Sequence, residues 1–355
     1  MTNRFGHWLA SNNIRNFNLA TKGGWHAFAE SAPRQPLPPV SASEFRAFTE
    51  EELEDYNDSR AVWNANPPAM KTAQLVRGFS ILDQVMASSY RDGDRLRGSA
   101  VIDAAPALGK TTIATRYARD FHRRALRRSG LKTEEGHQRI PVAFVPLDSG
   151  VTLKGLNQKI LSFYGHPGAH RATTSRLASL AVDCVRSCQT KLIIIDDLHF
   201  VDFKHRRGQE VSNHLKGLAN EMPATFIYVG VQLKAKKFFD EGLYGEDASF
   251  AQTSRRATRV PVDPFTVSTG PGMRAWCDLL ARFEDHLLLL NKERGMLVEQ
   301  AKEIFRRTQG NIGSLTNLLD RACQFAIRSG RETIDAEILN AVTVDNAAET
   351  SIFSP

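Results

Sequence analysis

Three consecutive residues, Gly109, Lys110 and Thr111, follow a short apolar run and open a segment with helical spacing. This order of strand, tight loop and helix is typical of a phosphate-binding loop. Backbone N–H groups of such a loop attract a polyphosphate, the lysine places a cation on the β and γ oxygens, and the threonine hydroxyl binds Mg²⁺. The segment therefore predicts a nucleotide site formed by Ala105, Pro106, Ala107, Leu108, Gly109, Lys110, Thr111 and Thr112.

The loop departs from the full motif G-x-x-x-x-G-K-[ST], because Ala104 stands where the first glycine is expected. Read by itself, Gly-Lys-Thr is also compatible with an ordinary helix start. A second signal further along the chain is needed to favour the nucleotide site.

That second signal is the acidic pair Asp196 and Asp197, which follows four apolar residues. A carboxylate at the carboxyl end of a buried strand, beside a phosphate-binding loop, holds Mg²⁺. We therefore predict Thr111 and Asp196 as metal ligands. Asp197 is placed to orient or deprotonate an attacking water.

The elements that must position these residues alternate between strand and helix. Apolar runs predict strands, and 3.6-residue periodicity predicts the helices between them. This alternation predicts an α/β fold with a parallel sheet covered on both faces by helices. The strands are expected at 99–103, 140–147, 191–197, 224–230 and 258–262.

Beyond Pro264 the strand signals end, and four helical patterns predict an all-helical lid that packs as a bundle. The part before residue 41 is polar, with isolated Trp8 and Trp25 and a proline-rich end, and we expect an arm whose aromatic residues pack on their own domain or on a partner. The expected division is a flexible arm at 1–40, a helical lead-in at 41–97, a P-loop core at 98–265, a lid at 266–345 and a tail at 346–355.

Composition limits the class of protein. The chain of 355 residues has 42% hydrophobic residues, which is enough for two packed cores, and a formal net charge of +7. A modest basic excess permits nucleic-acid binding without requiring it. No apolar run has the length of a membrane span, the amino terminus lacks the pattern of a signal peptide, and we expect a cytoplasmic protein with no membrane partner.

Together these motifs resemble those of the AAA+ ATPases, in which Walker A, Walker B, further strands and a helical lid follow in this order. Within that class the chain is similar to the TniB/TnsC-like regulators of DNA transposition. The segments that carry this similarity are Tyr56-Asn-Asp-Ser-Arg60, Ile194-Ile-Asp-Asp-Leu-His199, Thr225-Phe-Ile-Tyr-Val-Gly230 and Thr308-Gln-Gly-Asn-Ile-Gly-Ser-Leu315.

The resemblance implies further site residues. A polar sensor follows the fourth strand in AAA+ proteins, and Gln232 is the best match. An arginine finger that reaches a neighbouring subunit precedes the fifth strand, and Arg255 is the best match, which implies self-association into a ring or filament. Asp197 stands where many relatives have glutamate, so hydrolysis is expected to be slow. Gly313 occupies the position of the usual lid arginine.

The candidate residues for binding DNA lie in loops that face the central pore of AAA+ assemblies. Basic residues there would contact phosphates without reading sequence. For each of them a solvated surface charge is an equally good interpretation, as it is for the basic end of the helix at 111–128. The candidates are Lys154, Lys204, Arg206 and Arg207.

The leading hypothesis is an ATP- and Mg²⁺-dependent regulator that oligomerises on double-stranded DNA. From the resemblance, its partners are a transposase of the DDE integrase type and a target-selection adaptor. One alternative is a nucleotide-bound scaffold that hydrolyses little, as the alanines of the loop and Asp197 would allow. Another is a STAND-type or initiator-like DNA-associated ATPase.

Overall fold

The computed structural model describes residues 3–92, 97–201, 203, 205–233 and 257–344. These residues form two compact units, and the chain passes between them four times. The sheet unit consists of residues 17–31 and 74–263, and the helical unit consists of residues 1–16, 32–73 and 264–355. This division differs from the expected series of consecutive segments, because both units are assembled from separated stretches of chain.

The sheet unit is built on a parallel sheet, which confirms the predicted α/β fold. The described strands are β1 (Ser99–Asp103), β2 (Val142–Pro146), β3 (Leu192–Asp196), β4 (Thr225–Gly230) and β5 (Ala257–Pro261). Their order across the sheet is β2-β3-β4-β1-β5, and every pair runs parallel. β1, the strand that leads into the phosphate-binding loop, therefore lies between β4 and β5.

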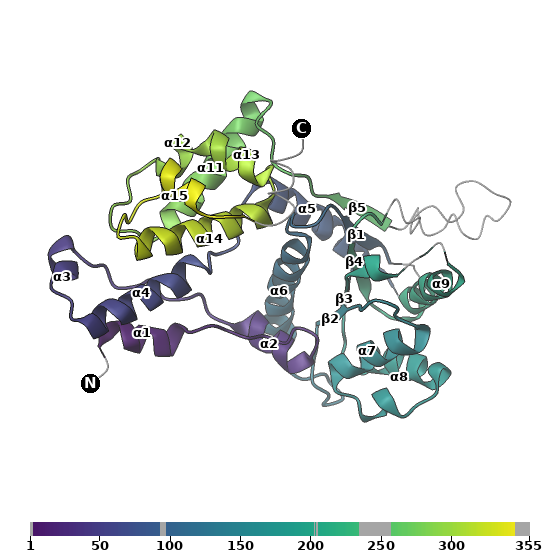
Figure 1. Ribbon diagram of the computed structural model, residues 1–355. Helices are drawn as coiled ribbons and strands as arrows, with labels where there is room; N and C mark the ends of the chain where they lie inside the picture. Colours follow the sequence, from purple (N-terminus) through teal and green to yellow (C-terminus); the bar gives the residue numbers. More distant parts are fainter. Residues whose placement is uncertain (1–2, 93–96, 202, 204, 234–256, 345–355) are drawn as a thin grey trace. The chain divides into compact units, whose positions relative to one another are not determined.

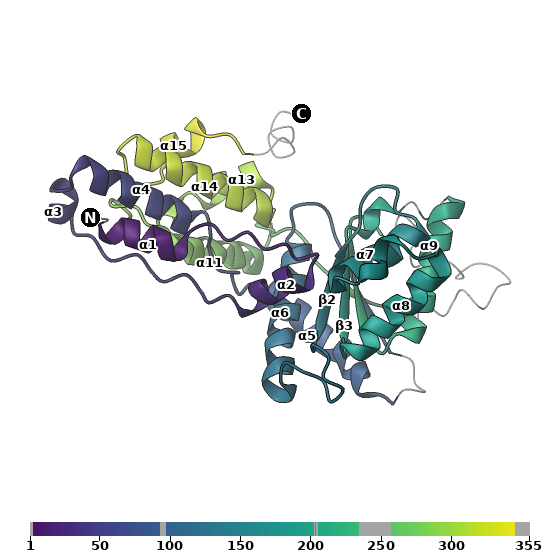
Figure 2. The ribbon, with the colours of Figure 1, turned by 90° about the horizontal axis from the view of Figure 1, so that it is seen from below.

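Helices cover both faces of this sheet, as the apolar, buried strands β2, β3 and β4 require. Figure 2 shows α2 (Lys22–Glu30), α5 (Ala73–Met86) and α6 (Lys110–Ser129) on one face. The other face is covered by α7 (Leu153–Tyr164), α8 (Thr174–Ser187) and α9 (Arg206–Glu221) (Figures 1 and 2). Residues 192–196 are all buried in this arrangement. The carboxyl ends of β1, β3 and β4 consequently meet at one edge, with α6 beginning beside them.

Helix α2 belongs to this unit although it was expected in a flexible arm. Trp25 is fully buried, stacks on Phe144 at 6.0 Å between ring centroids, and donates from Nε1 to Nδ1 of His122 at 3.3 Å. Arg119 and Arg123 of α6 donate to the carbonyl oxygen of Ala29, and both also reach the carbonyl of Ser31. Guanidinium groups at the last carbonyls of a helix satisfy them and complement the helix dipole. Two arginines of the basic run on α6 therefore hold α2 and are not simply solvated charges.

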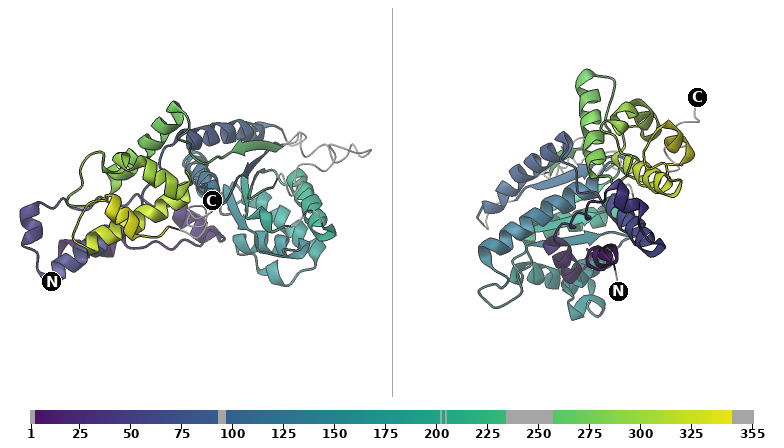
Figure 3. Two further views of the ribbon diagram at one scale, coloured as in Figure 1. Left: turned by 45° about the horizontal axis from the view of Figure 1, so that its top comes forward. Right: turned by 90° about the vertical axis from the view of Figure 1, so that its left-hand side faces the viewer.

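The helical unit joins the amino-terminal helices to the predicted lid helices. It contains α1 (Arg4–Asn12), α3 (Ala42–Arg46), α4 (Glu50–Asn64), α11 (Gly270–His286), α12 (Met296–Glu299), α13 (Ala301–Thr308), α14 (Ile312–Arg328) and α15 (Ala336–Ala341). α4 packs on both α1 and α14, and Figure 3 shows the dark blue α4 beside the yellow-green α14.

The contact between α4 and the lid helices rests on a buried ion pair. Arg60 is 1% exposed and donates to both carboxylate oxygens of Glu332, at 2.6 and 3.0 Å. Its guanidinium also lies 4.5 Å from the centre of the Tyr56 ring. The expected lead-in segment around Arg60 is thus part of the helical unit. Among the described helices of both units, none has the length and apolarity needed to cross a membrane.

Candidate functional site

The loop between β1 and α6 adopts the shape that a phosphate-binding loop requires. Gly109 has φ 81° and ψ 20°, a left-handed conformation that glycine adopts at little cost, and α6 begins at the next residue. Ala107 also has a positive φ, of 60°, which costs an alanine about 1 kcal/mol. Residues 105–107 are exposed, whereas Leu108 is buried and anchors the loop on the core.

Lys110, Thr111 and Asp196 are brought together from α6 and β3. The Thr111 hydroxyl donates to Oδ2 of Asp196 at 3.0 Å, although 85 residues separate them. The Lys110 ammonium donates to the carbonyl oxygen of Ala105 at 2.6 Å and so closes the loop. The backbone N–H of Asp197 donates to Oδ1 of Asp196 at 2.9 Å, which fixes that carboxylate at the strand end. Thr112, also predicted, is the exposed third residue of α6.

Burial disfavours the charged forms of Lys110 and Asp196. Desolvation lowers the pKa of Lys110, and the carboxylates of Asp196, Asp103 and Asp197 act in the opposite direction. Desolvation likewise raises the pKa of Asp196, with a further rise from Asp197, while its hydrogen bonds and Lys110 act against it. A buried ammonium and a buried carboxylate are each stabilised by an added counter-charge. A polyphosphate against Lys110 and a cation against Asp196 would supply those charges.

The oxygen atoms of Thr111 and Asp196 fit Mg²⁺, a hard cation that binds oxygen ligands and keeps several waters or phosphate oxygens. Their hydroxyl and carboxylate lie within hydrogen-bond distance, so one ion can reach both. No cluster of three or more His, Cys, Asp or Glu side chains suited to a metal is found in the part of the chain that the structure describes. The donor set thus fits a nucleotide-bound ion and not a cage made wholly of protein.

Asp197 and Gln232, the two further residues predicted for catalysis, both lie just beyond strand ends and both have positive φ, 57° and 54°. β3 ends at Asp196, so Asp197 falls in the turn before a short 3₁₀ helix, and its Oδ1 lies 3.9 Å from Nδ1 of His199. Gln232 follows β4 and has an exposed side chain. Because β4 lies between β3 and β1, both residues are at the same edge as the loop.

The predicted basic residues are only partly described. Lys154 is exposed on the first turn of α7, and Arg206 begins α9 and forms an exposed i,i+4 ion pair with Glu210 at 3.3 Å. Both helices follow strands and so begin at the carboxyl edge. Arg255 and Lys204 lie outside the described residues, as does the side chain of Arg207.

One residue of this edge was missed by the sequence analysis. Asp103, the last residue of β1, is 5% exposed, and its Oδ1 accepts a hydrogen bond from the backbone N–H of Leu233 at 3.0 Å. The available signal was an acidic residue at the end of a buried strand directly before the phosphate-binding loop. The same reasoning that selected Asp196 would have selected Asp103.

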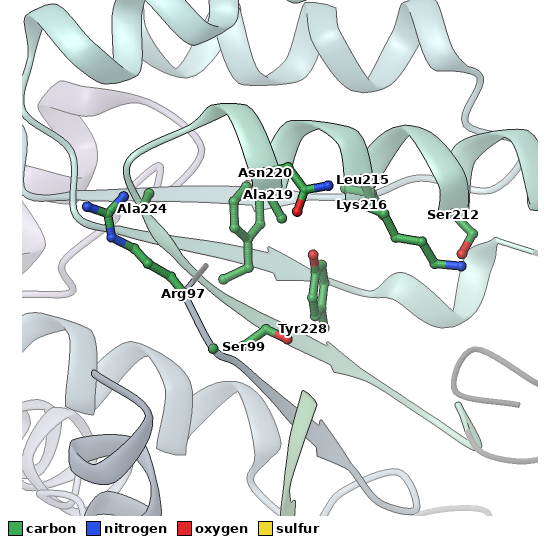
Figure 4. Close-up of a pocket in the computed structure, with 11 residues that line it drawn as sticks. Arg97, Ser99, Ser212, Leu215, Lys216, Ala219, Asn220, Ala224 and Tyr228 are labelled. Carbon is green, nitrogen blue, oxygen red and sulfur yellow. The ribbon is translucent and has the colours of Figure 1, made fainter. Parts of the chain in front are cut away.

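A separate cavity, lined by both polar and apolar residues, lies at the opposite edge, where β1 begins. Figure 4 shows Arg97 and Ser99 from the start of β1 on one side and Ser212 and Lys216 from α9 on the other. Its volume is about 50 Å³, enough for a few water molecules and too small for a nucleoside triphosphate. This cavity is not the nucleotide site, and none of the predicted residues lines it.

Comparisons with known proteins were made for both the sequence and the structure of the chain. Residues 74–240 match the family model described as bacterial TniB protein. No curated protein matches the chain.

Among solved structures, the chain resembles ORC2 of Aeropyrum pernix in ADPNP and ADP complexes, with 13% identity, a TM-score of 0.56 and coverage of 81% of this chain and 70% of that one. It also resembles ORC1 of Aeropyrum pernix in complex with DNA, with 15% identity, a TM-score of 0.56 and coverage of 82% and 69%. The corresponding values for Cdc6p of Pyrobaculum aerophilum are 14%, 0.55, 82% and 74%. At these identities the likeness shows the fold.

The predicted resemblance is therefore confirmed: residues 74–240 are similar to the TniB family, and the chain has the predicted α/β P-loop fold with a helical carboxyl-terminal part.

Proposed function

We propose that this protein is an ATP-dependent regulator of DNA transposition that assembles on double-stranded DNA. The observation that carries the proposal is the cluster of Lys110, Thr111 and Asp196 at the end of a TniB-like sheet unit. The cluster supports ATP as the ligand and Mg²⁺ as its counter-ion. The TniB match and the DNA-bound relative support a role on DNA.

In this proposal each residue of the edge has a separate task. The Lys110 ammonium leaves the Ala105 carbonyl and binds the β and γ oxygens, while N–H groups of residues 107–112 surround the phosphates. Thr111 and Asp196 hold Mg²⁺, which when bound neutralises charge on the phosphates. Asp197 orients the attacking water, and Gln232 donates to the transferring phosphate.

Assembly and partners complete the proposal. Arg255 of one copy serves the site of the next, which ties ring or filament formation to bound ATP. Lys154, Lys204, Arg206 and Arg207 contact DNA phosphates. The assembly recruits and stimulates a DDE-type transposase, with a target-selection adaptor as a further partner, and hydrolysis disassembles it.

Binding and assembly test this proposal directly. The wild-type protein should bind ATP in a Mg²⁺-dependent manner and form filaments or rings on duplex DNA with a non-hydrolysable analogue, as seen by electron microscopy. Lys110→Ala should abolish both, whereas Lys132→Ala, which removes an exposed lysine elsewhere in the same unit, should leave both intact. A wild-type protein that stays monomeric with analogue and DNA would refute the proposal.

A second candidate is a nucleotide-bound scaffold, or an initiator-like ATPase, that hydrolyses little. It is favoured by Asp197, a carboxylate one methylene shorter than glutamate and held in a left-handed turn beside His199. Steady-state turnover of the wild type and of Asp197→Ala separates the two candidates. Equal rates would favour the scaffold, and a fall of about 100-fold or more in the variant would favour the hydrolysing regulator.

A further inference from the structure

The turn that follows β4 is held by a residue of the neighbouring strand. β4 and β1 pair in register, with Asp103 opposite Gly230, and the backbone N–H of Ala104 donates to the carbonyl of Gly230 at 3.4 Å. The chain then turns at Val231 and Gln232, and Leu233 returns to the core with 0% exposure. Its N–H donates to Oδ1 of Asp103 at 3.0 Å.

The side chains leave this turn little freedom. A Cβ atom at Gly230 would lie 2.7 Å from Cδ2 of Leu233, so the leucine is folded back directly over the glycine. Between them Gln232 has φ 54°, a conformation that a non-glycine residue keeps only when its surroundings impose it. The Leu233 side chain and the bond to Asp103 together supply that constraint.

The consequence concerns the direction of the Gln232 side chain. Because β4 lies between β3 and β1, the turn stands between Asp196 and the phosphate-binding loop, with neighbouring strands about 4.8 Å apart. Leu233 is buried and anchors the turn, whereas the Gln232 side chain is exposed and can reach a ligand. A buried carboxylate is a strong acceptor for a backbone N–H, which makes Asp103 a firm anchor.

We propose that Asp103 is a positioning residue, which holds the turn at 230–233 so that the Gln232 amide meets the transferring phosphate. This inference rests on the proposed ATPase function and adds to it a residue outside the Walker motifs. In this inference Asp103 acts through its bond to the Leu233 N–H and need not touch the nucleotide. Its carboxylate also acts on the charge of Lys110, and Asp103→Asn, which removes that charge but keeps an acceptor, separates the two effects.

The variants Asp103→Ala, Asp103→Asn, Gln232→Ala and the double variant Asp103→Ala/Gln232→Ala test it by kcat and KM for ATP. Gln232→Ala should lower kcat about 100-fold, as expected for loss of one oriented donor, and Asp103→Ala should approach that loss with KM within about threefold. Asp103→Asn keeps an acceptor for the Leu233 N–H and should restore most of the rate. The double variant should be no slower than Gln232→Ala.

Hydrogen exchange of peptides that cover Leu233 gives a readout independent of turnover. Protection should fall in Asp103→Ala and be retained in Asp103→Asn, while the control Asp183→Ala, an exposed carboxylate on α8, should change neither exchange there nor turnover. The inference is overturned if the losses multiply in the double variant, or if Asp103→Asn is as slow as Asp103→Ala. A wild type that does not hydrolyse ATP would instead refute the proposed function, so the two failures are distinct.

Discussion

Replacement of Trp25 by alanine should destabilise the sheet unit strongly. The ring is fully buried against Phe144 and Phe28, and its indole N–H meets Nδ1 of His122. Trp25→Ala removes the packing contacts of the indole ring and leaves a cavity between α2, α6 and β2. It also leaves the buried His122 without this donor.

The size of the effect follows from these contacts. Truncation of a buried tryptophan or phenylalanine to alanine costs about 3–5 kcal/mol, and the loss of one modest hydrogen bond adds about 1 kcal/mol. We therefore expect the free energy of unfolding of the sheet unit to fall by about 4–6 kcal/mol in Trp25→Ala. Trp25→Phe keeps most of the ring and should lose about 1–2 kcal/mol.

Urea unfolding followed by hydrogen exchange measures this change unit by unit. Tryptophan fluorescence is unsuitable, because Trp25→Ala leaves no tryptophan in the sheet unit. The other tryptophans, Trp8, Trp63 and Trp276, all belong to the helical unit. With a slope of about 2–3 kcal/mol/M, the midpoint for peptides of β2 and α6 should move by roughly 1.3–3 M. The control Trp8→Ala, which removes a buried ring of the helical unit, should lower protection there. A shift below about 0.4 M in Trp25→Ala would show that α2 does not pack as described.

Three further predictions concern stability. Burial, followed by His26 and Arg123, lowers the pKa of His122 from 6.5 to about 4. As the pH falls, the unfolded chain therefore takes up a proton on His122 before the folded chain does, and the stability present above pH 6.5 is lost as the pH falls toward 4. In urea titrations, about 2 kcal/mol of the free energy of unfolding should be lost between pH 6.5 and pH 5. His122→Gln should not show this loss. Ala107→Gly should remove the cost of the positive φ at residue 107 and raise the melting temperature by a few degrees. The melting temperature should stay unchanged if the greater freedom of glycine in the unfolded chain cancels this gain. A clear fall in the melting temperature would contradict the strain assigned to the loop. Arg60→Ala should cost the helical unit about 3–5 kcal/mol in urea unfolding, because Glu332 stays buried without its cation, and Arg60→Lys should recover part of that loss.

The sequence by itself predicted the elements and the centre of the candidate site. The strands were predicted within about two residues of their observed ends. For β2, β3 and β4 the reason is that a strand buried on both faces is apolar along nearly its whole length. Lys110 and Thr111 were predicted from the Gly-Lys-Thr motif, and Asp196 was predicted because parallel strands bring their carboxyl ends to one edge, a rule that needs no coordinates. The structure brings Thr111 and Asp196 within hydrogen-bond distance.

The tertiary structure decided what joins distant segments. The bond between Asp103 and Leu233 spans 130 residues and depends on β4 lying beside β1, an order that strand patterns do not encode. The burial of Trp25 depends on a site made by α6 and β2, and the arginines that cap α2 look in sequence like any solvated basic run. The ion pair of Arg60 with Glu332 likewise joins two ends of the chain. Local sequence patterns determine which face of a helix or strand is apolar. Which other element packs against that face depends on the packing of the whole chain.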